Sequence, residues 1–153
     1  MHLKERGRAL TTTVARLLEK KGNEVWSIGP DATVYEAIKL MADKGVGALL
    51  VLEGDALAGI VSERDYARKV ILLERSSRET PVRDIMTSEV VSVLPKQTME
   101  DCMALMTARH IRHLPVLDGG KVVGIVSIGD LVKSIIADKE VLIEQLEGYI
   151  SGR

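Results

Sequence analysis

The sequence has a single cysteine, Cys102, no phenylalanine and one tryptophan among its 153 residues. One cysteine cannot form an internal disulfide, so we interpret Cys102 as a packed core thiol. With so few aromatic rings, the chain has few platforms on which nucleic-acid bases stack. Its 21 basic and 22 acidic residues leave no surplus of positive charge for a polyanion. These absences argue against a nucleic-acid-binding protein.

Long apolar runs are missing as well. No stretch approaches the roughly 18 to 20 residues of a membrane span, and the opening MHLKERGRAL lacks the apolar centre of a signal peptide. We therefore expect a cytoplasmic protein with no membrane partner. A chain of this length has room for one compact domain or for two closely packed halves.

What the sequence does contain is an internal repeat. Residues 25–73 align without a gap with residues 90–138, at an offset of 65, and 16 of the 49 positions are identical. The stretch GIVSERD at residues 59–65 returns as GIVSIGD at residues 124–130. Self-similarity over such a length indicates a duplicated structural unit.

Each copy predicts the element order β-α-β-β-α. The predicted strands are Val25–Ile28, Ala48–Leu52 and Leu57–Val61 in the first copy, and Val90–Val93, His113–Leu117 and Val122–Val126 in the second. Apolar residues at helical spacing follow each first strand, and the last helix of each copy begins near Glu63 or Ile128. A unit of about 50 residues cannot bury both faces of its sheet alone. We expect an α/β (α+β) fold in which the two repeats pack with pseudo-two-fold symmetry.

The flanking segments set the predicted domain boundaries. Thr13–Leu18 resembles Pro81–Met86, so each repeat has a leading segment, and apolar spacing after residue 138 predicts an amphipathic helix suited to packing on a partner subunit. The expected parts are an N-terminal tail (1–12), repeat 1 with its leading helix (13–73), a linker (74–80), repeat 2 with its leading segment (81–138), and a C-terminal helix and tail (139–153).

Several features favour structural roles. We interpret Gly119-Gly120 as a hairpin turn and Lys20-Lys21 as a solvated helix end. His110 and His113 lie three residues apart, but one is expected on a helix and the other on a strand, so we expect no metal site. No Ser-His-Asp or Cys-His grouping has supporting spacing, so we expect no active site. The methionines expected in the core are Met41, Met99, Met103 and Met106.

The repeated turn has two interpretations. Ser62 and Asp65, like Ser127 and Asp130, are spaced as in a capping box, in which the serine accepts from a backbone amide and the acid reaches back. The same turn leaves amides and the positive end of a helix dipole at its edge. A nucleotide needs such groups together with an acceptor for its ribose hydroxyls, which an aspartate supplies.

The duplicated unit, its G-h-h-S-x-x-D turn and the preceding RHLPVLD resemble a tandem pair of CBS domains, a Bateman module, of the stand-alone bacterial type. The resemblance covers about residues 13–138. It implies that Asp65 and Asp130 bind ribose and that Ser62 and Ser127 lie beside ribose or phosphate. The implied ligand is an adenine nucleotide, AMP first, with ATP, NAD and S-adenosylmethionine left open.

In this family each site crosses the repeats. The resemblance implies a first cleft of Ser62, Arg64, Asp65, Thr87, Val90, Ser92, Ile111, Arg112, His113 and Pro115. It implies a second cleft of Gly22, Val25, Val46, Gly47, Ala48, Ser127 and Asp130. Arg64, Arg112 and His113 would gather in the first cleft and suit phosphate oxygens. The second cleft has no matching cations unless Lys20 or Lys21 reaches it, so we expect unequal sites.

The function we expect is a non-catalytic regulatory sensor that works as a homodimer and is read by an unidentified protein partner. Nucleotide bound between the repeats would favour one relative orientation of them. Two alternatives stay open. One is a constitutive interaction module whose clefts remain empty, and the other is an enzyme acting on nucleotides, for which the sequence offers no base or metal site.

Overall fold

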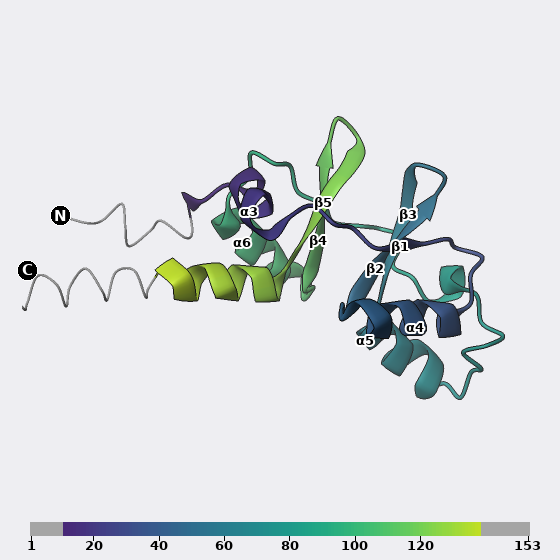
Figure 1. Ribbon diagram of the computed structural model, residues 1–153. Coiled ribbons are helices and arrows are strands. Elements are labelled where there is room, and N and C mark those ends of the chain that lie inside the picture. The colour runs from purple at the N-terminus through teal and green to yellow at the C-terminus, as the bar shows by residue number, and fades with distance from the viewer. Residues whose placement is uncertain (1–10, 139–153) are drawn as a thin grey trace, which may run out of the picture. The chain divides into compact units, whose positions relative to one another are not determined.

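The structure, a computed structural model, describes residues 11–138 (Figure 1). Its elements in chain order are α3 (Val14–Lys21), β1 (Ser27–Ile28), α4 (Val34–Lys44), β2 (Ala48–Glu53), β3 (Ala56–Ser62), α5 (Glu63–Tyr66), the π-helix η1 (Ala67–Ile71), the 3₁₀ turn η2 (Val82–Asp84), α6 (Met99–Arg109), β4 (His113–Asp118) and β5 (Lys121–Ser127). Residues 128–138 form a further helix. The mixed α/β class and the tandem repeat of elements are confirmed.

Contacts divide the chain into two compact units. The β1–β3 unit comprises residues 24–91 and 119–122. The described part of the β4–β5 unit comprises residues 11–23, 92–118 and 123–138. Each unit therefore contains the leading segment of the other repeat. The helix predicted from residue 139 onward lies outside the described residues.

The β1–β3 unit is a three-stranded sheet in the order β1-β2-β3. Strand β2 pairs antiparallel with β3, with Ala48 opposite Ser62, and parallel with β1. Its first four residues are all buried, as the continuous apolar run predicts. Helix α4 begins at a capping box of Thr33 and Glu36 and covers the sheet with its apolar side. The core of this unit joins Val34, Ala37, Met41, Leu49, Val51, Val61, Val70, Val82 and Ile85.

A close approach of two backbones explains Gly59 in the repeated GIVS stretch. Thr87 exchanges both backbone hydrogen bonds with Ile60, at 2.9 and 3.0 Å. A Cβ on Gly59 would lie 2.7 Å from the Thr87 carbonyl oxygen and 2.8 Å from the sulfur of Met86. Only glycine leaves room for this contact. The leading segment of repeat 2 therefore packs directly against strand β3 of the β1–β3 unit.

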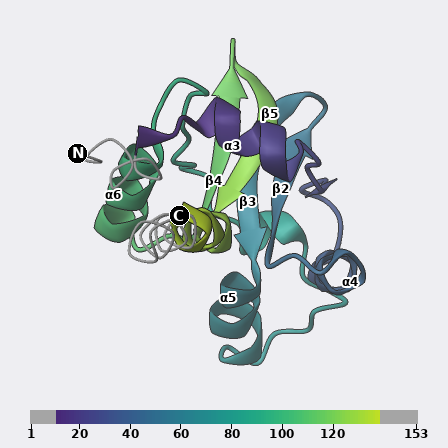
Figure 2. The ribbon, with the colours of Figure 1, turned by 60° about the vertical axis from the view of Figure 1, so that its left-hand side comes forward.

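The same arrangement recurs in the β4–β5 unit, where α3 crosses the strands (Figure 2). Backbone amides of Val14 and Ala15 donate to the carbonyls of Gln97 and Pro95. A Cβ on Gly124 would lie 2.8 Å from the methyl groups of Leu18. Leu18 and Gly124 thus repeat the relationship of Met86 and Gly59.

Two expectations about packing need correction. The predicted strand Val90–Val93 reduces to one bridge between Val93 and Val116, because Leu94 already turns its amide to the side chain of Gln97. Met103 is 37% exposed, since the buried side of α6 follows Met99, Cys102 and Met106. Cys102 is buried as expected, and burial, aided by the charge of Asp101, raises the pKa of its thiol to about 11.

Candidate nucleotide-binding turns

The turn of repeat 1 is a capping box at the start of α5. The amide and hydroxyl of Ser62 donate to Oδ2 of Asp65 at 2.9 and 3.0 Å, and the amide of Asp65 donates to the Ser62 hydroxyl at 3.2 Å. The amine of Lys69 lies 3.2 Å from the other oxygen, Oδ1, and also donates to the carbonyl of Ile85. The carboxylate of Asp65 is therefore fixed in one orientation at the helix N-terminus, with 15% of its side chain exposed.

The turn of repeat 2 has the same geometry around a different cation. The amide of Ser127 donates to Oδ2 of Asp130 at 2.8 Å, and the amide of Asp130 donates back to the Ser127 hydroxyl at 3.2 Å. Lys21, at the end of α3, donates to the same Oδ2 at 2.5 Å and to the carbonyl of Ile125 at 2.7 Å. Burial alone would raise the pKa of Asp130, but the hydrogen bonds from Lys21 and Ser127 outweigh it and hold the pKa below its ordinary value.

The amine of Lys21 donates the hydrogen bond that the backbone amide of Thr87 donates in the other unit. The carbonyl of Ile60 accepts from the amide of Thr87, whereas the carbonyl of Ile125, the equivalent position 65 residues later, accepts from the Lys21 amine. Lys21 is the exposed last residue of α3, as interpreted from the sequence, but its amine is paired with Asp130 rather than left to solvent. A cation does reach Asp130, which the sequence left open.

The first residues of β2 and β4 lie beside the turn of their own repeat. The carbonyl of Gly47 accepts from the amide of Glu63 at 3.1 Å, and the carbonyl of Arg112 accepts from the amide of Ile128 at 2.9 Å. The pKa of His113 is lowered, first by burial and then by the charge of Lys21, although Asp130 opposes this. His113 is accordingly neutral near pH 7.

The sequence-predicted cleft residues are divided between the two units. Those in the β1–β3 unit are Ser62, Arg64, Asp65, Thr87 and Val90 of the first cleft and Val25, Val46, Gly47 and Ala48 of the second. Those in the β4–β5 unit are Ser92, Ile111, Arg112, His113 and Pro115 of the first cleft and Gly22, Ser127 and Asp130 of the second. Within its unit, Thr87 is joined to the strand that leads into the Ser62 turn, and Gly22 follows the lysine that holds Asp130. The grouping across the repeats stays a prediction.

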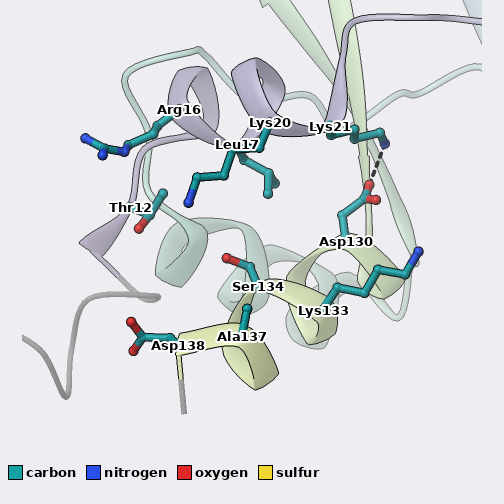
Figure 3. A pocket seen from close by; sticks show the side chains of 10 residues that line it. All are labelled: Thr12, Arg16, Leu17, Lys20, Lys21, Asp130, Lys133, Ser134, Ala137 and Asp138. Atoms are coloured by element: carbon teal, nitrogen blue, oxygen red, sulfur yellow. Dashed lines mark hydrogen bonds and ion pairs between the residues drawn. The ribbon is translucent and has the colours of Figure 1, made fainter. Parts of the chain in front are cut away.

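The β4–β5 unit also contains a cavity, which shares Asp130 with the predicted second cleft. It has a volume of about 460 Å³ and lies between α3 and the helix of residues 128–138 (Figure 3). Its lining is Thr12, Arg16, Leu17, Lys20, Lys21, Asp130, Lys133, Ser134, Ala137 and Asp138. The sequence pattern that hints at this cavity is the spacing of Arg16 and Lys20, which are four residues apart and therefore lie on the same side of a helix.

Two kinds of feature are absent from the described residues. Over residues 11–138, no three His, Cys, Asp or Glu side chains are grouped so that they could hold a metal ion. In the same range no helix is both long and apolar enough to cross a membrane.

Comparison with known proteins identifies the repeat. The CBS domain family matches residues 14–72 and 82–137. The mitochondrial CBS domain-containing protein CBSX3 of Arabidopsis thaliana is 41% identical over 152 residues, covering 93% of this chain and 73% of that protein. A solved structure of a protein with CBS domains from Burkholderia ambifaria is 59% identical, with a TM-score of 0.81 and coverage of 83% of this chain and 96% of that one. The CBS domain pair of protein MJ0100, solved with 5′-methylthioadenosine and S-adenosyl-L-methionine, shares the fold at 22% identity, with a TM-score of 0.72 and coverage of 80% and 94%.

Proposed function

This chain belongs to the CBS domain family and carries the domain as a tandem pair, and on that basis we propose that it is a non-catalytic regulatory module that binds adenosine-type ligands. The observation that carries the proposal is the repeated turn, in which Asp65 and Asp130 are each held by an amide and a lysine at a helix start. A carboxylate fixed in this way is preorganised to accept two hydroxyls of a ribose.

The ligand we propose is AMP, with ATP, NAD and S-adenosylmethionine as the other adenosyl candidates. The solved CBS pair with two bound adenosyl compounds supports this class. In the proposed first cleft the phosphate lies near Arg64 and Arg112, while His113 contributes as a neutral hydrogen-bonding group. In the proposed second cleft Lys21 is the cation beside the ribose-binding Asp130. The two sites are therefore unequal in the source of their positive charge.

We further propose a homodimer that passes the ligand signal to a protein partner. Ile128, Val132 and Ile136 are 46, 47 and 50% exposed and recur every four residues along one helix. Such an apolar stripe on a helix is a surface that association would cover. Ligand binding would then shift the population of domain orientations that the partner recognises.

The experiment that tests this function begins with the ligand itself. Mass spectrometry of small molecules released from the purified protein should find an adenosyl compound. A ligand that binds only the native state adds about 2.7 kcal/mol at a hundredfold excess over its Kd, so AMP should raise the Tm measurably and GMP should do so less. The competing function is an interaction module with empty clefts. This alternative is favoured by the ion pairs of Asp65 and Asp130 with lysines, because both carboxylates already have partners within the protein. It predicts no released ligand and no Tm shift with AMP, ATP, NAD or S-adenosylmethionine.

A further inference from the structure

The carboxylate of Asp65 has most of its acceptor positions occupied within the protein. A carboxylate offers about four lone-pair positions, two on each oxygen. Oδ2 accepts from the amide and the hydroxyl of Ser62, and the amine of Lys69 lies 3.2 Å from Oδ1. One position on Oδ1 is then left, whereas the two hydroxyls of a ribose need two. A ribose can therefore bind through both hydroxyls only if one of these donors leaves.

Lys69 is the donor that leaves most readily. The Ser62 amide is backbone, and the Ser62 hydroxyl is held in the capping box because it also accepts from the amide of Asp65. The side chain of Lys69 is 43% exposed, so water can solvate its amine once the contact with Asp65 is broken. Ion pairs with this exposure contribute little free energy. The bonds from Ser62 keep the carboxylate oriented after the amine has moved.

Repeat 2 forms the same turn without a lysine at this position. The residue 65 positions after Lys69 is Ser134. Asp130 is paired instead with Lys21, which donates to Oδ2, the oxygen that also accepts from the backbone of the turn. In Asp65, by contrast, the donors are spread over both oxygens. The contact on Oδ1 is thus a property of repeat 1 rather than a requirement of the CBS fold.

The same amine connects the turn to the leading segment of repeat 2. Lys69 donates to the carbonyl of Ile85 at 2.8 Å, and Ile85 is fully buried. Two residues later, Thr87 pairs through its backbone with Ile60, in the strand that ends at the turn. Because one ammonium group contacts both the Asp65 and the Ile85 oxygens, its displacement from the first changes its bond to the second.

We propose that Lys69 forms an autoinhibitory contact, in which its amine occupies Oδ1 of Asp65 until a ribose hydroxyl displaces it. This inference rests on the proposed ribose-binding role of Asp65 and adds the regulation of that site. The ligand class that releases the contact is a nucleoside with both ribose hydroxyls, because only a pair of donors needs the position that Lys69 occupies. Release of the amine also alters the bond to Ile85, so occupancy of the turn changes the environment of the leading segment of repeat 2.

The test compares adenosine with dideoxyadenosine, which lacks both ribose hydroxyls, on the full chain. Amide NMR signals of Ser62 and Asp65 follow the affinity of this turn separately from that of the other repeat. Lys69→Met removes the competing amine and should tighten adenosine binding about two- to fivefold, the range expected for an exposed ion pair. It should leave the affinity for dideoxyadenosine unchanged. The matched control, Arg68→Met, removes an exposed cation from the neighbouring position and should change neither affinity.

A second measurement follows the amine itself. In the wild type, the NMR signals of the Lys69 ε-methylene group should shift as adenosine saturates the turn and stay in place with dideoxyadenosine. An unmoved Lys69 signal at saturating adenosine would show that the amine stays on Asp65. The expected effect of Lys69→Met is a gain in affinity, which a misfolded variant cannot produce.

Three further results would overturn the autoinhibitory contact while leaving adenosine binding intact. They are unchanged or weaker adenosine binding by Lys69→Met, an equal gain in dideoxyadenosine binding, and an equal gain in Arg68→Met. The last two would mean a general effect of charge rather than competition for Asp65. A failure of adenosine to bind at Ser62 and Asp65 in the wild type and in both variants would instead contradict the proposed function and this regulation together.

Discussion

The amine of Lys21 donates to Oδ2 of Asp130 at 2.5 Å and joins two residues that are 109 positions apart. The equivalent carboxylate, Asp65, forms an ion pair with Lys69, four residues further along the chain, whose amine lies 3.2 Å from Oδ1. Each repeat thus holds the same aspartate with a lysine from an unrelated place in the chain. The partner of Asp130 ties the start of the chain to the last described helix, so it stabilises tertiary structure.

Replacing Lys21 should therefore destabilise the β4–β5 unit. Lys21→Gln removes the ion pair and leaves Asp130, whose side chain is 17% exposed, without its cation. We expect a loss of about 1–2 kcal/mol in the free energy of unfolding, measured by urea denaturation. Lys20→Gln, next to it on the same helix, is the control and should cost less than about 0.5 kcal/mol. Equal losses would mean that the Lys21–Asp130 pair contributes nothing specific.

Stability should fall when the solution is acidified through the range in which histidine titrates. The folded-state pKa of His113 lies below its ordinary 6.5, owing to burial and to Lys21, with Arg112 lowering and Asp130 raising it. The unfolded chain then binds the proton more readily, so stability is lost as pH drops below about 6.5. Asp130 has a lowered pKa, so its contribution is present above its ordinary 3.8 and is lost only at more acid pH.

Thermal unfolding of the wild type and of His113→Gln measures this dependence. Between about pH 8 and pH 5, the wild-type Tm should fall more steeply than that of the variant. Parallel curves would show that the other histidines or the acids determine the acid sensitivity.

The two close-packed glycines should differ in their tolerance of a methyl group. Gly59→Ala places Cβ against the carbonyl of Thr87, which is backbone, and should cost roughly 1–3 kcal/mol. Gly124→Ala meets the methyl groups of Leu18, which a rotamer change relieves in part, so its cost should be smaller. Gly29→Ala is the control because nothing lies within 4 Å of the new Cβ. Urea unfolding that ranks Gly124→Ala as the most damaging would contradict this packing.

The local features of the fold could be predicted because they depend on neighbours in sequence. The capping box at Ser62 follows from a spacing of three residues and forms as expected. Boxes with the same spacing form at Thr33 and Thr98. The predicted strand Val90–Val93 failed for the opposite reason. A β-prone composition does not determine whether a partner strand lies alongside, and within this segment only Val93 pairs, with Val116.

The site depends on contacts that no local pattern encodes. Lys21 is 109 residues from Asp130, and its role follows only from the packing of α3 on the β4–β5 unit rather than on its own repeat. The same holds for the pairing of Thr87 with Ile60. The duplication predicted two equivalent turns. They differ in the group that reaches the strand before the turn, which is the Thr87 backbone in one unit and the Lys21 side chain in the other.

The proposed dimer can be tested on the exposed stripe of the last described helix. Val132→Lys puts a charge in the middle of the stripe and should shift the mass measured by light scattering from dimer toward monomer. Leu94→Lys is a matched control, because Leu94 is 44% exposed and lies outside the stripe. A wild-type monomer, or dissociation by both variants, would contradict the assignment of this surface.

The phosphate and ribose contributions to the proposed first cleft should be separable. Arg112→Ala removes a guanidinium that would meet only the phosphate, so AMP should bind more weakly while adenosine binding stays nearly unchanged. Calorimetric titration of the variant with both ligands measures the difference. Equal weakening of AMP and adenosine would place Arg112 against the base or the ribose, or indicate that the variant is misfolded.

The most direct test of the account is titration calorimetry of AMP into the wild type, Asp65→Asn and Asp130→Asn. Asparagine retains the size and part of the capping ability of aspartate but loses the charged acceptor for ribose hydroxyls. A hydrogen bond to a charged group contributes roughly 1.5–3 kcal/mol, so Asp65→Asn should lower the affinity of the first cleft about ten- to a hundredfold. Asp130→Asn should leave that affinity unchanged and alter only a second, separate binding event. If both variants lose stability alike and bind AMP as the wild type does, the turns are helix caps and the ligand-binding account is wrong.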